Sequence, residues 1–158
     1  MEKEKPVLFY EFEFYVCSNF SSFQVEWDGD VWMTSEHAYQ ASKFEDKNIR
    51  EKIKNARSAH DAMKLAKVVY QDQKRSDWYD IKLSVMEDIV RAKLSQHYYV
   101  QKKLLQTGDR EIIESSPKDG FWGWGPNKDG ENHLGKIWMK LRDELRTGKI
   151  QKLEETYE

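Results

Sequence analysis

The spacing of apolar residues along the chain predicts a mostly helical protein. Apolar side chains recur every three or four residues in two segments, at Trp78, Ile81, Val85, Ile89 and Ala92, and again at Leu134, Ile137, Trp138, Leu141 and Leu145. Residues with this spacing share one face of a helix, so each segment is expected to form a helix with one buried face. The first helix should cover about 77–97 and the second about 131–147, with Gly148 ending it.

Four shorter helices are expected in segments that lack helix-breaking residues. Thr34 or Ser35 supplies a cap for the first of them, since a hydroxyl at this position accepts a hydrogen bond from the first helical turn. The predicted helices cover about 35–45, 47–55, 58–69 and 99–106.

Two segments near the N-terminus read as strands. Residues 8–16, LFYEFEFYV, alternate between apolar and polar side chains, which is typical of a half-buried strand. Residues 24–33 carry a second apolar pattern, interrupted by Asp28-Gly29, a pair that favours a tight hairpin turn. We therefore expect an α+β fold, mostly helical, with a small antiparallel sheet.

Length and charge limit the architecture and the class of ligand. A chain of 158 residues fits one domain, which we place at 1–148, with a charged and frayed extension at 149–158. The 26 basic and 28 acidic residues leave a net charge of -2, so no general nucleic-acid-binding surface is expected. Cys17 is the single cysteine, no apolar run approaches the roughly 20 residues that span a membrane, and the first residues do not resemble a signal peptide. These features favour a cytoplasmic protein that does not enter membranes.

No motif in the sequence predicts a metal site. The histidines stand far apart and the single cysteine has no second thiol beside it, so the usual metal-ligand spacings are missing. The four histidines are His37, His60, His97 and His133. We expect neither a metal nor a cofactor.

The segment FWGWG, residues 121–125, is the first candidate for chemistry. Its glycines, Gly123 and Gly125, let a ligand approach the backbone closely, and Trp122 or Trp124 offers a flat face on which a base could stack. Ordinary core packing is an equally good explanation for one of the two tryptophans.

Charged side chains near aromatic residues form the second candidate. Glu36 lies in the first turn of a predicted helix, and Lys43 follows two turns later on the same face, so both could point into one pocket. Asp119 lies just before the tryptophan segment. Each acid also has an ordinary explanation, since Glu36 complements the helix dipole and Asp119 suits a turn. Together these residues indicate a nucleoside or nucleotide site.

Five blocks of sequence resemble the NADAR, or YbiA-like, family in content and in order. They cover nearly the whole chain between about 9 and 147, and the two blocks containing SEHAYQASKF and the tryptophan loop are specific in combination. The blocks are FYVCSNFSSF at 14–23, VWMTSEHAYQASKF at 31–44, KRSDWYDIKLSVM at 74–86, LLQTGDREIIESSPKDGFWGWG at 104–125 and DGENHLGKIWMKLRDELR at 129–146.

The resemblance implies a mostly helical α+β fold and an N-glycosidase, a hydrolase that cleaves the bond between ribose and a base-like amine. The implied substrates are phosphorylated intermediates of riboflavin biosynthesis or ADP-ribose attached to guanine, so the expected partner is a small ribosylated molecule or an ADP-ribosylated nucleic-acid base. The pocket of the family corresponds here to Ser18, Asn19, Glu36, Lys43, Arg75, Trp78, Asp119, Trp122 and Asn132.

Catalytic roles are expected for Glu36, Asp119 and Lys43. Cleavage of an N-glycosidic bond leaves positive charge on the sugar, which a carboxylate stabilises. We assign Glu36 to the attacking water or the ribosyl cation and Asp119 to the ribose hydroxyls or the base, with the reverse assignment open. Lys43 either balances the charge of Glu36 or forms a Schiff base with an opened ribose.

Substrate-binding roles are expected for the remaining pocket residues. Arg75, just before the helix that begins near Trp78, suits a phosphate, and Trp78 with Trp122 would sandwich the base. The chain differs from the family before the Arg75–Trp78 block, where a Gly-Arg pair is expected and Val68, Val69 and Tyr70 occupy the region. One anion contact is therefore missing or moved.

Cys17 is a second difference, because the family usually has a larger apolar residue there. Both differences leave the identity of the substrate more open than the type of reaction. A non-catalytic module that binds ADP-ribose or a nucleotide is the main alternative, and a purely structural domain with an aromatic core is the third.

Overall fold

The structure is a computed structural model that describes residues 5–10 and 12–155. These residues form two compact units, one made of Asn19–Lys93 and the other combining residues up to Ser18 with those from Leu94 onward. Each unit is described by itself. The boundary predicted after residue 148 stays a prediction.

A short hairpin opens the unit of residues 19–93. Strands β2 (Val25–Trp27) and β3 (Asp30–Trp32) pair in antiparallel register, with Glu26 opposite Val31. Asp28 and Gly29 both take positive φ angles, 53° and 80°, as a two-residue turn between twisted strands requires. The predicted hairpin is confirmed, although its strands are shorter than the predicted segment.

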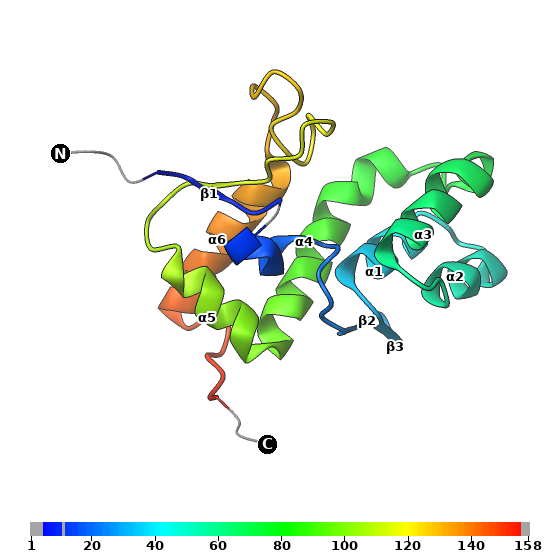
Figure 1. The fold of residues 1–158 in the computed structure, drawn as a ribbon. Helices are drawn as coiled ribbons and strands as arrows, with labels where there is room; N and C mark the ends of the chain where they lie inside the picture. The colour runs from blue at the N-terminus through cyan, green and yellow to red at the C-terminus, as the bar shows by residue number, and fades with distance from the viewer. Residues whose placement is uncertain (1–4, 11, 156–158) are drawn as a thin grey trace. The chain divides into compact units, whose positions relative to one another are not determined.

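Three short helices follow the hairpin and pack against one another (Figure 1). They are α1 (Ser35–Ala41), α2 (Lys47–Lys54) and α3 (Ala59–Lys64). Side chains of Thr34, Asp46 and Ser58 accept hydrogen bonds from the first turns of these helices and so fix where each begins. Large buried side chains, among them Trp32, Phe44 and Ile53, form the core beneath them.

The chain then reaches the longest helix through two irregular turns. A π-helical turn, η2 (Leu65–Val69), is followed by the short 3-10 helix η3 (Gln71–Gln73) and then by α4 (Trp78–Gln96). Trp78 and Ile89 are buried on α4, as the apolar spacing predicted, whereas Ile81, Val85 and Ala92 are partly exposed. Met86 and Val90 complete the buried face.

Two helices and a pair of very short strands form the other unit. Strands β1 (Val7–Leu8) and β4 (Ile112–Ile113) are parallel, and α5 (Tyr98–Gln106) packs against α6 (His133–Thr147). The apolar face of α6 is buried, and Gly148 ends the helix with a φ of 86°. The mostly helical α+β class with a small antiparallel sheet is confirmed, and the parallel pair is an addition that the sequence did not predict.

The strand predicted at residues 8–16 is wrong. Within the described residues only Val7–Leu8 is extended, and Phe12–Cys17 forms the 3-10 helix η1. β1 ends where its partner ends, because the last hydrogen bond of the ladder among the described residues joins the Phe9 N–H to the carbonyl of Ile113, the final residue of β4.

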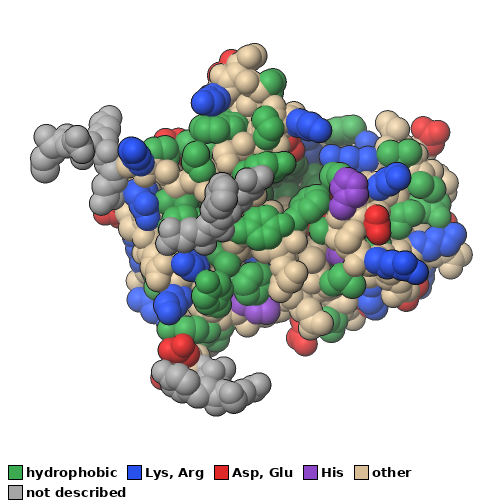
Figure 2. Space-filling view, in the orientation of Figure 1, with side chains coloured by type: hydrophobic (Ala, Val, Ile, Leu, Met, Phe, Trp, Pro, Cys, Tyr) green, Lys and Arg blue, Asp and Glu red, His purple; other side chains and the backbone are tan. Residues whose placement is uncertain are grey.

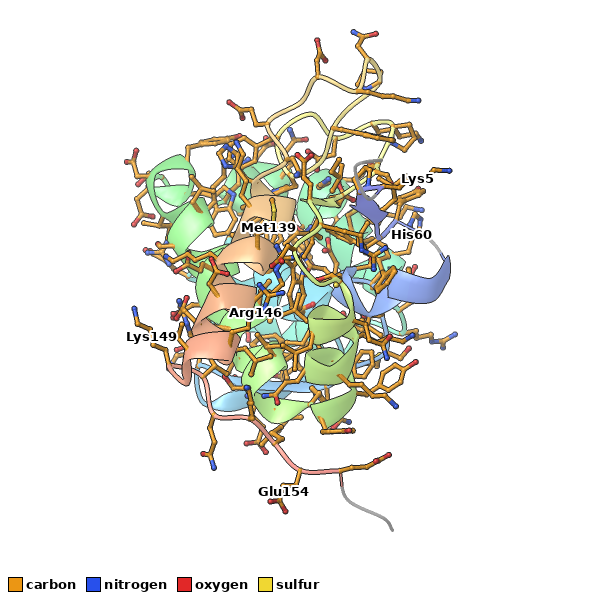
Figure 3. The ribbon with its side chains drawn as sticks, turned by 90° about the vertical axis from the view of Figure 1, so that its left-hand side faces the viewer. Lys5, His60, Met139, Arg146, Lys149 and Glu154 are labelled. Carbon is orange, nitrogen blue, oxygen red and sulfur yellow. The ribbon has the colours of Figure 1, made fainter. Side chains whose placement is uncertain are left out.

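The predicted frayed end is also wrong over residues 150–153. Ile150 is buried, and Gln101 on α5 donates to the carbonyl of Gln151 and accepts from the N–H of Leu153. Figure 3 labels Arg146 in the last turn of α6, from which its guanidinium binds the Asp109 carboxylate at 2.9 Å. The contacts of Gln101 attach residues 150–153 to α5.

Gly135 allows α6 to begin directly against β4. A β-carbon at this position would lie 2.1 Å from the carbonyl oxygen of Ile112 and 2.5 Å from the side chain of Asn132. The same carbonyl accepts a hydrogen bond from Asn132 Nδ2 at 2.9 Å. Only a residue without a side chain fits between these groups.

We predict that Gly135→Ala destabilises the protein by about 1–3 kcal/mol, because backbone must shift to relieve the overlap. Gly120→Ala is the matched control, since a β-carbon there meets nothing within 4 Å. Urea unfolding of both variants checks this prediction. A Gly135→Ala variant as stable as the wild type would contradict it.

Candidate active site

Helix α1 buries polar residues that would ordinarily face water. Every residue from Ser35 to Ala41 is buried. Thr34 Oγ1 contacts His37 Nδ1 at 2.8 Å, and His37 Nε2 contacts the Ala56 carbonyl at 3.0 Å. Burial lowers the pKa of His37, which the bond to the Ala56 carbonyl partly opposes. The polar groups of this helix are therefore held in an enclosed network.

Glu36 is a carboxylate in that enclosed setting, with only 6% of its surface exposed. Its backbone N–H donates to the carbonyl of Asn19, and its Oε1 accepts from Gln40 Nε2 at 2.6 Å. The Gln40 Oε1 atom is itself buried and finds no donor in the described part of the chain. An enclosed carboxylate beside an unsatisfied amide is costly for folding, which favours a role in chemistry.

Lys43 is equally enclosed, at 7% exposure, in the turn that follows α1. Its Nζ lies 5.4 Å from the centre of the Tyr39 ring and 6.0 Å from the Trp78 ring. Burial lowers the pKa of Lys43 to about 8, with the charge of Lys67 adding to this and Glu36 acting in the opposite direction. The structure thus places an ammonium of reduced basicity within the electrostatic reach of Glu36.

Trp78 forms an aromatic wall beside these charges. Its ring packs against Tyr39 with centroids 5.3 Å apart and planes tilted by 57°. Only 2% of Trp78 is exposed. It serves as a wall of the site more readily than as an open stacking plate.

Arg75 is tied to this group through its backbone and engaged elsewhere through its side chain. Its N–H donates to the Lys43 carbonyl at 2.7 Å. Its guanidinium donates twice to Asp77, at 2.6 and 3.0 Å, and lies 3.7 Å from Glu45. The hydrogen bonding of the Arg75 guanidinium to the Asp77 carboxylate is the main cause that raises the pKa of Arg75.

Asn19 has structural contacts at the start of α1, whereas a backbone contact of Ser18 lies in its own unit. The Asn19 Oδ1 atom accepts from Ser35 Oγ at 3.1 Å, and its Nδ2 donates to Met86 Sδ at 3.3 Å. Ser18 belongs to the other unit, where its N–H donates to the carbonyl of Tyr15.

The loop of residues 114–132 is held by backbone hydrogen bonds, although its composition suggested an open ligand loop. N–H groups of residues 130–134 donate to carbonyls of residues 120–124 at 2.8–3.1 Å. A β-carbon on Gly123 would meet Glu114, and one on Gly130 would meet the Gly123 carbonyl at 2.6 Å. Gly123 and Gly130 therefore let two parts of the protein's own chain approach each other. The sequence had suggested that the glycines of this loop let a ligand approach the backbone.

Asp119 holds the turn that carries Trp122. Its Oδ1 accepts from the N–H groups of Phe121 and Trp122, at 3.0 and 2.8 Å. The Phe121 ring packs edge-on against Trp122 at 4.8 Å and lies 4.5 Å from His133. The partly exposed Trp122 is thus mounted on a fixed turn.

Asn132 connects this loop to β4 and α6. Its backbone is left-handed, with φ 51° and ψ 43°. Its side chain donates to Ile112 and accepts from Glu114, so its observed contacts are structural.

The nine predicted residues therefore fall into two groups. Asn19, Glu36, Lys43, Arg75 and Trp78 belong to the unit of residues 19–93, and Ser18, Asp119, Trp122 and Asn132 belong to the other. Tyr39 and Gln40 lie at the site and were missed. Their spacing from Glu36, three and four residues along the same helix, was a signal that could have found them.

Three further observations concern surface charge, metal-ligand groups and membrane-spanning helices. On the face shown in Figure 2, Lys and Arg side chains are interspersed with acidic and apolar ones. Within residues 5–10 and 12–155, no three His, Cys, Asp or Glu side chains are grouped as metal ligands would be. Of the helices that the structure describes, none has the length and apolar character to cross a membrane.

Comparison with known proteins connects the chain to one family. The profile of the NADAR domain matches residues 8–146. A riboflavin biosynthesis protein of Vibrio vulnificus is 43% identical over 150 residues, which are 90% of this chain and 39% of that longer protein. An N-glycosidase of Nostoc punctiforme is 40% identical over 136 residues, covering 84% of this chain and 86% of its own.

A solved structure extends the comparison to the fold. The NMR structure of the Escherichia coli protein YbiA superimposes with a TM-score of 0.84 and 31% identity, covering 99% of this chain and 94% of that one. The chain spans about two fifths of the Vibrio protein but most of the Nostoc and Escherichia proteins.

The lowered pKa of Lys43 predicts a specific pH dependence of stability. The group titrates near 8 in the folded protein and near 10.5 in the unfolded chain, so the unfolded chain binds more protons between these values. The free energy of unfolding should therefore rise with pH across this window. Lys43→Met should be more stable than the wild type at pH 7, by on the order of 3 kcal/mol, and the difference should shrink toward pH 10.5.

Urea unfolding between pH 7 and pH 10.5 checks this expectation. Lys64→Met, which changes an exposed lysine on α3, is the matched control and should show no such trend. A Lys43→Met variant whose difference from the wild type is constant across the range would refute it.

Proposed function

This chain belongs to the NADAR family, and on that premise we propose that it hydrolyses the N-glycosyl bond between a phosphorylated ribose and a base-like amine. The hydrolase class follows from relatives named N-glycosidase, which match most of this chain and most of their own length. Riboflavin biosynthesis appears in the name of the Vibrio relative, which favours phosphorylated intermediates of that pathway as substrates. ADP-ribosylated guanine is the alternative substrate.

The observation that carries the proposal is the enclosed pair of Glu36 and Lys43 beside Trp78. Two groups of opposite charge, the Glu36 carboxylate and the Lys43 ammonium, are buried within electrostatic reach of each other. Fold stability alone gives no reason to keep them there, because burial of charged groups is unfavourable. A substrate that develops charge during the reaction does provide a reason to keep charged groups in this enclosed position.

Glu36 is the group that faces the sugar in this proposal. As the bond from C1 of ribose to nitrogen breaks, C1 gains positive charge, which the Glu36 carboxylate stabilises, and the same carboxylate takes a proton from the attacking water. Gln40 holds Glu36 through its Nε2 donor. The water oxygen ends on C1, and ribose phosphate is released.

Lys43 handles the departing nitrogen. With a pKa of about 8, its ammonium is acidic enough to donate a proton to the leaving amine near neutral pH. The neutral form, also populated near this pH, is the form that would attack an opened ribose aldehyde. Reduction with borohydride separates the two roles, because it would trap an imine on Lys43.

Asp119 and Trp122, which belong to the other unit, are given their roles from the family resemblance alone. The Asp119 Oδ1 atom is engaged by backbone N–H groups, so Oδ2 is the atom assigned to the ribose hydroxyls. Trp122 provides the face for the base. Asn132 supports both residues by fixing the loop to β4.

Glu36→Gln should stop catalysis and leave binding intact. The glutamine keeps an oxygen that accepts from Gln40 but has no negative charge for the sugar, so kcat should fall by about 100-fold or more. Release of ribose 5-phosphate from a phosphorylated ribosylaminopyrimidine, and of ADP-ribose from ADP-ribosylated guanosine, measures turnover. Glu51→Gln, on the exposed side of α2, is the control.

A wild type that binds these compounds and releases nothing would support the non-catalytic binding module instead. A wild type that neither binds nor cleaves them would leave only a structural domain.

Two substitutions of Asp119 distinguish its structural role in the turn from its proposed role in catalysis. Asp119→Asn keeps an oxygen for the N–H groups of Phe121 and Trp122, so the loop should stay folded while kcat falls by about 100-fold. Asp119→Ala should lose activity and about 1 kcal/mol of stability as well. Equal activity in Asp119→Asn and wild type would reduce Asp119 to a turn residue.

A further inference from the structure

Positive charges gather around Lys43 in a protein that is negative overall. The charges that act on its ammonium come from Lys67, Lys74 and Lys82, and Glu36 is the one carboxylate among them. Among the described residues, the contacts of Lys43 Nζ are with the aromatic rings of Tyr39 and Trp78. An enclosed ammonium that has no hydrogen-bond acceptor among the described residues, and on which the charges of three other lysines act, is an arrangement that an anion would stabilise.

Tyr79 holds two of these lysines in place. Lys74 Nζ donates to the Tyr79 hydroxyl at 3.0 Å and lies 4.9 Å from the ring centre. Lys82 Nζ lies 5.3 Å from the same ring. The hydrogen bond from Lys74 lowers the pKa of Tyr79. Both ammonium groups are therefore positioned around one side chain, 69% of which is exposed to solvent.

The beginning of α4 brings this cluster to Lys43. Tyr79 is the second residue of α4 and directly follows Trp78, whose ring Lys43 contacts. The Arg75 N–H donates to the Lys43 carbonyl, which joins the segment carrying Lys74 to the turn after α1. The first turn of a 19-residue helix adds its own partial positive charge.

Arg75 is less suited to an anion than its position in the sequence suggested. Two of its donors bind Asp77, and Glu45 is nearby. These acids already balance its charge. Lys67, which immediately precedes the exposed Val68 and Val69 where the family resemblance led us to expect a Gly-Arg pair, offers a replacement for the missing positive charge.

We propose that Lys74 and Lys82, held around Tyr79 beside Lys43 and supplemented by the charge of Lys67, bind the phosphate of the substrate. The inference rests on the proposed function for the identity of the phosphate ester. It assigns the phosphate contact to lysines that no sequence motif singled out and gives Arg75 a bracing role. Because lysines present point charges, the site should accept any compact phosphate dianion, including inorganic phosphate.

The test measures binding of inorganic phosphate and of ribose 5-phosphate by isothermal titration calorimetry. Lys74→Gln/Lys82→Gln should weaken both affinities by about tenfold or more, since each lost charged contact weakens binding substantially. Lys47→Gln/Lys64→Gln removes the same net charge from exposed positions on α2 and α3 and should change little. Arg75→Gln should have a smaller effect than the first double variant, and thermal unfolding confirms that each variant is folded.

The outcomes separate this inference from the proposed function. Loss of phosphate binding in Lys74→Gln/Lys82→Gln supports the inference, even if the wild type cleaves no substrate. A wild type that binds phosphate but cleaves no substrate contradicts only the hydrolase proposal. Equal phosphate binding in the wild type and the double variant overturns the inference. So does a wild type that binds neither ligand, or an Arg75→Gln variant that is folded and alone loses binding.

With an active wild type, the substrate distinguishes binding from chemistry. The double variant should raise KM for the phosphorylated substrate by about tenfold and leave kcat within about twofold. For the dephosphorylated nucleoside the change in KM should be much smaller than for the phosphorylated substrate. A drop in kcat with KM unchanged would contradict a phosphate-binding role.

Discussion

Burial of a carboxylate and an ammonium at one end of a small helical unit is the constraint on which the site depends. Glu36 and Lys43 are 6% and 7% exposed, and removal of such groups from water is unfavourable unless other charges compensate. The hydrophobic surroundings that enclose them, including Trp78 and Tyr39, also lower the pKa of Lys43. The same enclosure that weakens the fold therefore also lowers the basicity of Lys43, to which we assign proton donation in the proposed reaction.

The sequence predicted the parts of the fold that depend on local patterns and missed those that depend on long-range contacts. Helices α4 and α6 were found because their apolar spacing repeats over several turns, and the hairpin was found because Asp28-Gly29 specifies its turn. The strand at 8–16 failed because its length depends on its partner β4, which covers only Ile112–Ile113. The attachment of residues 150–153 depends on Gln101, about fifty residues away, and no local pattern reports it.

The candidate site was predictable to the extent that it lies on α1 and in the turn that follows it. Glu36 and Lys43 share a face by spacing alone, and the same rule, applied further, would have included Gln40. The contacts of Asp119 and Asn132 were not predictable, because both side chains bind backbone groups whose positions exist only in the folded loop. Nothing in the sequence indicated that the glycines of that loop accommodate other parts of the chain.

The lowered basicity of Lys43 is the link between burial and chemistry, and it can be measured directly. An NMR titration of the Lys43 side chain, in wild type and in Glu36→Gln, reports its pKa and the contribution of the neighbouring carboxylate. The account predicts a pKa of about 8 in the wild type and a lower one in Glu36→Gln, where the opposing negative charge is gone. A pKa near the ordinary lysine value, unchanged by the substitution, would contradict it.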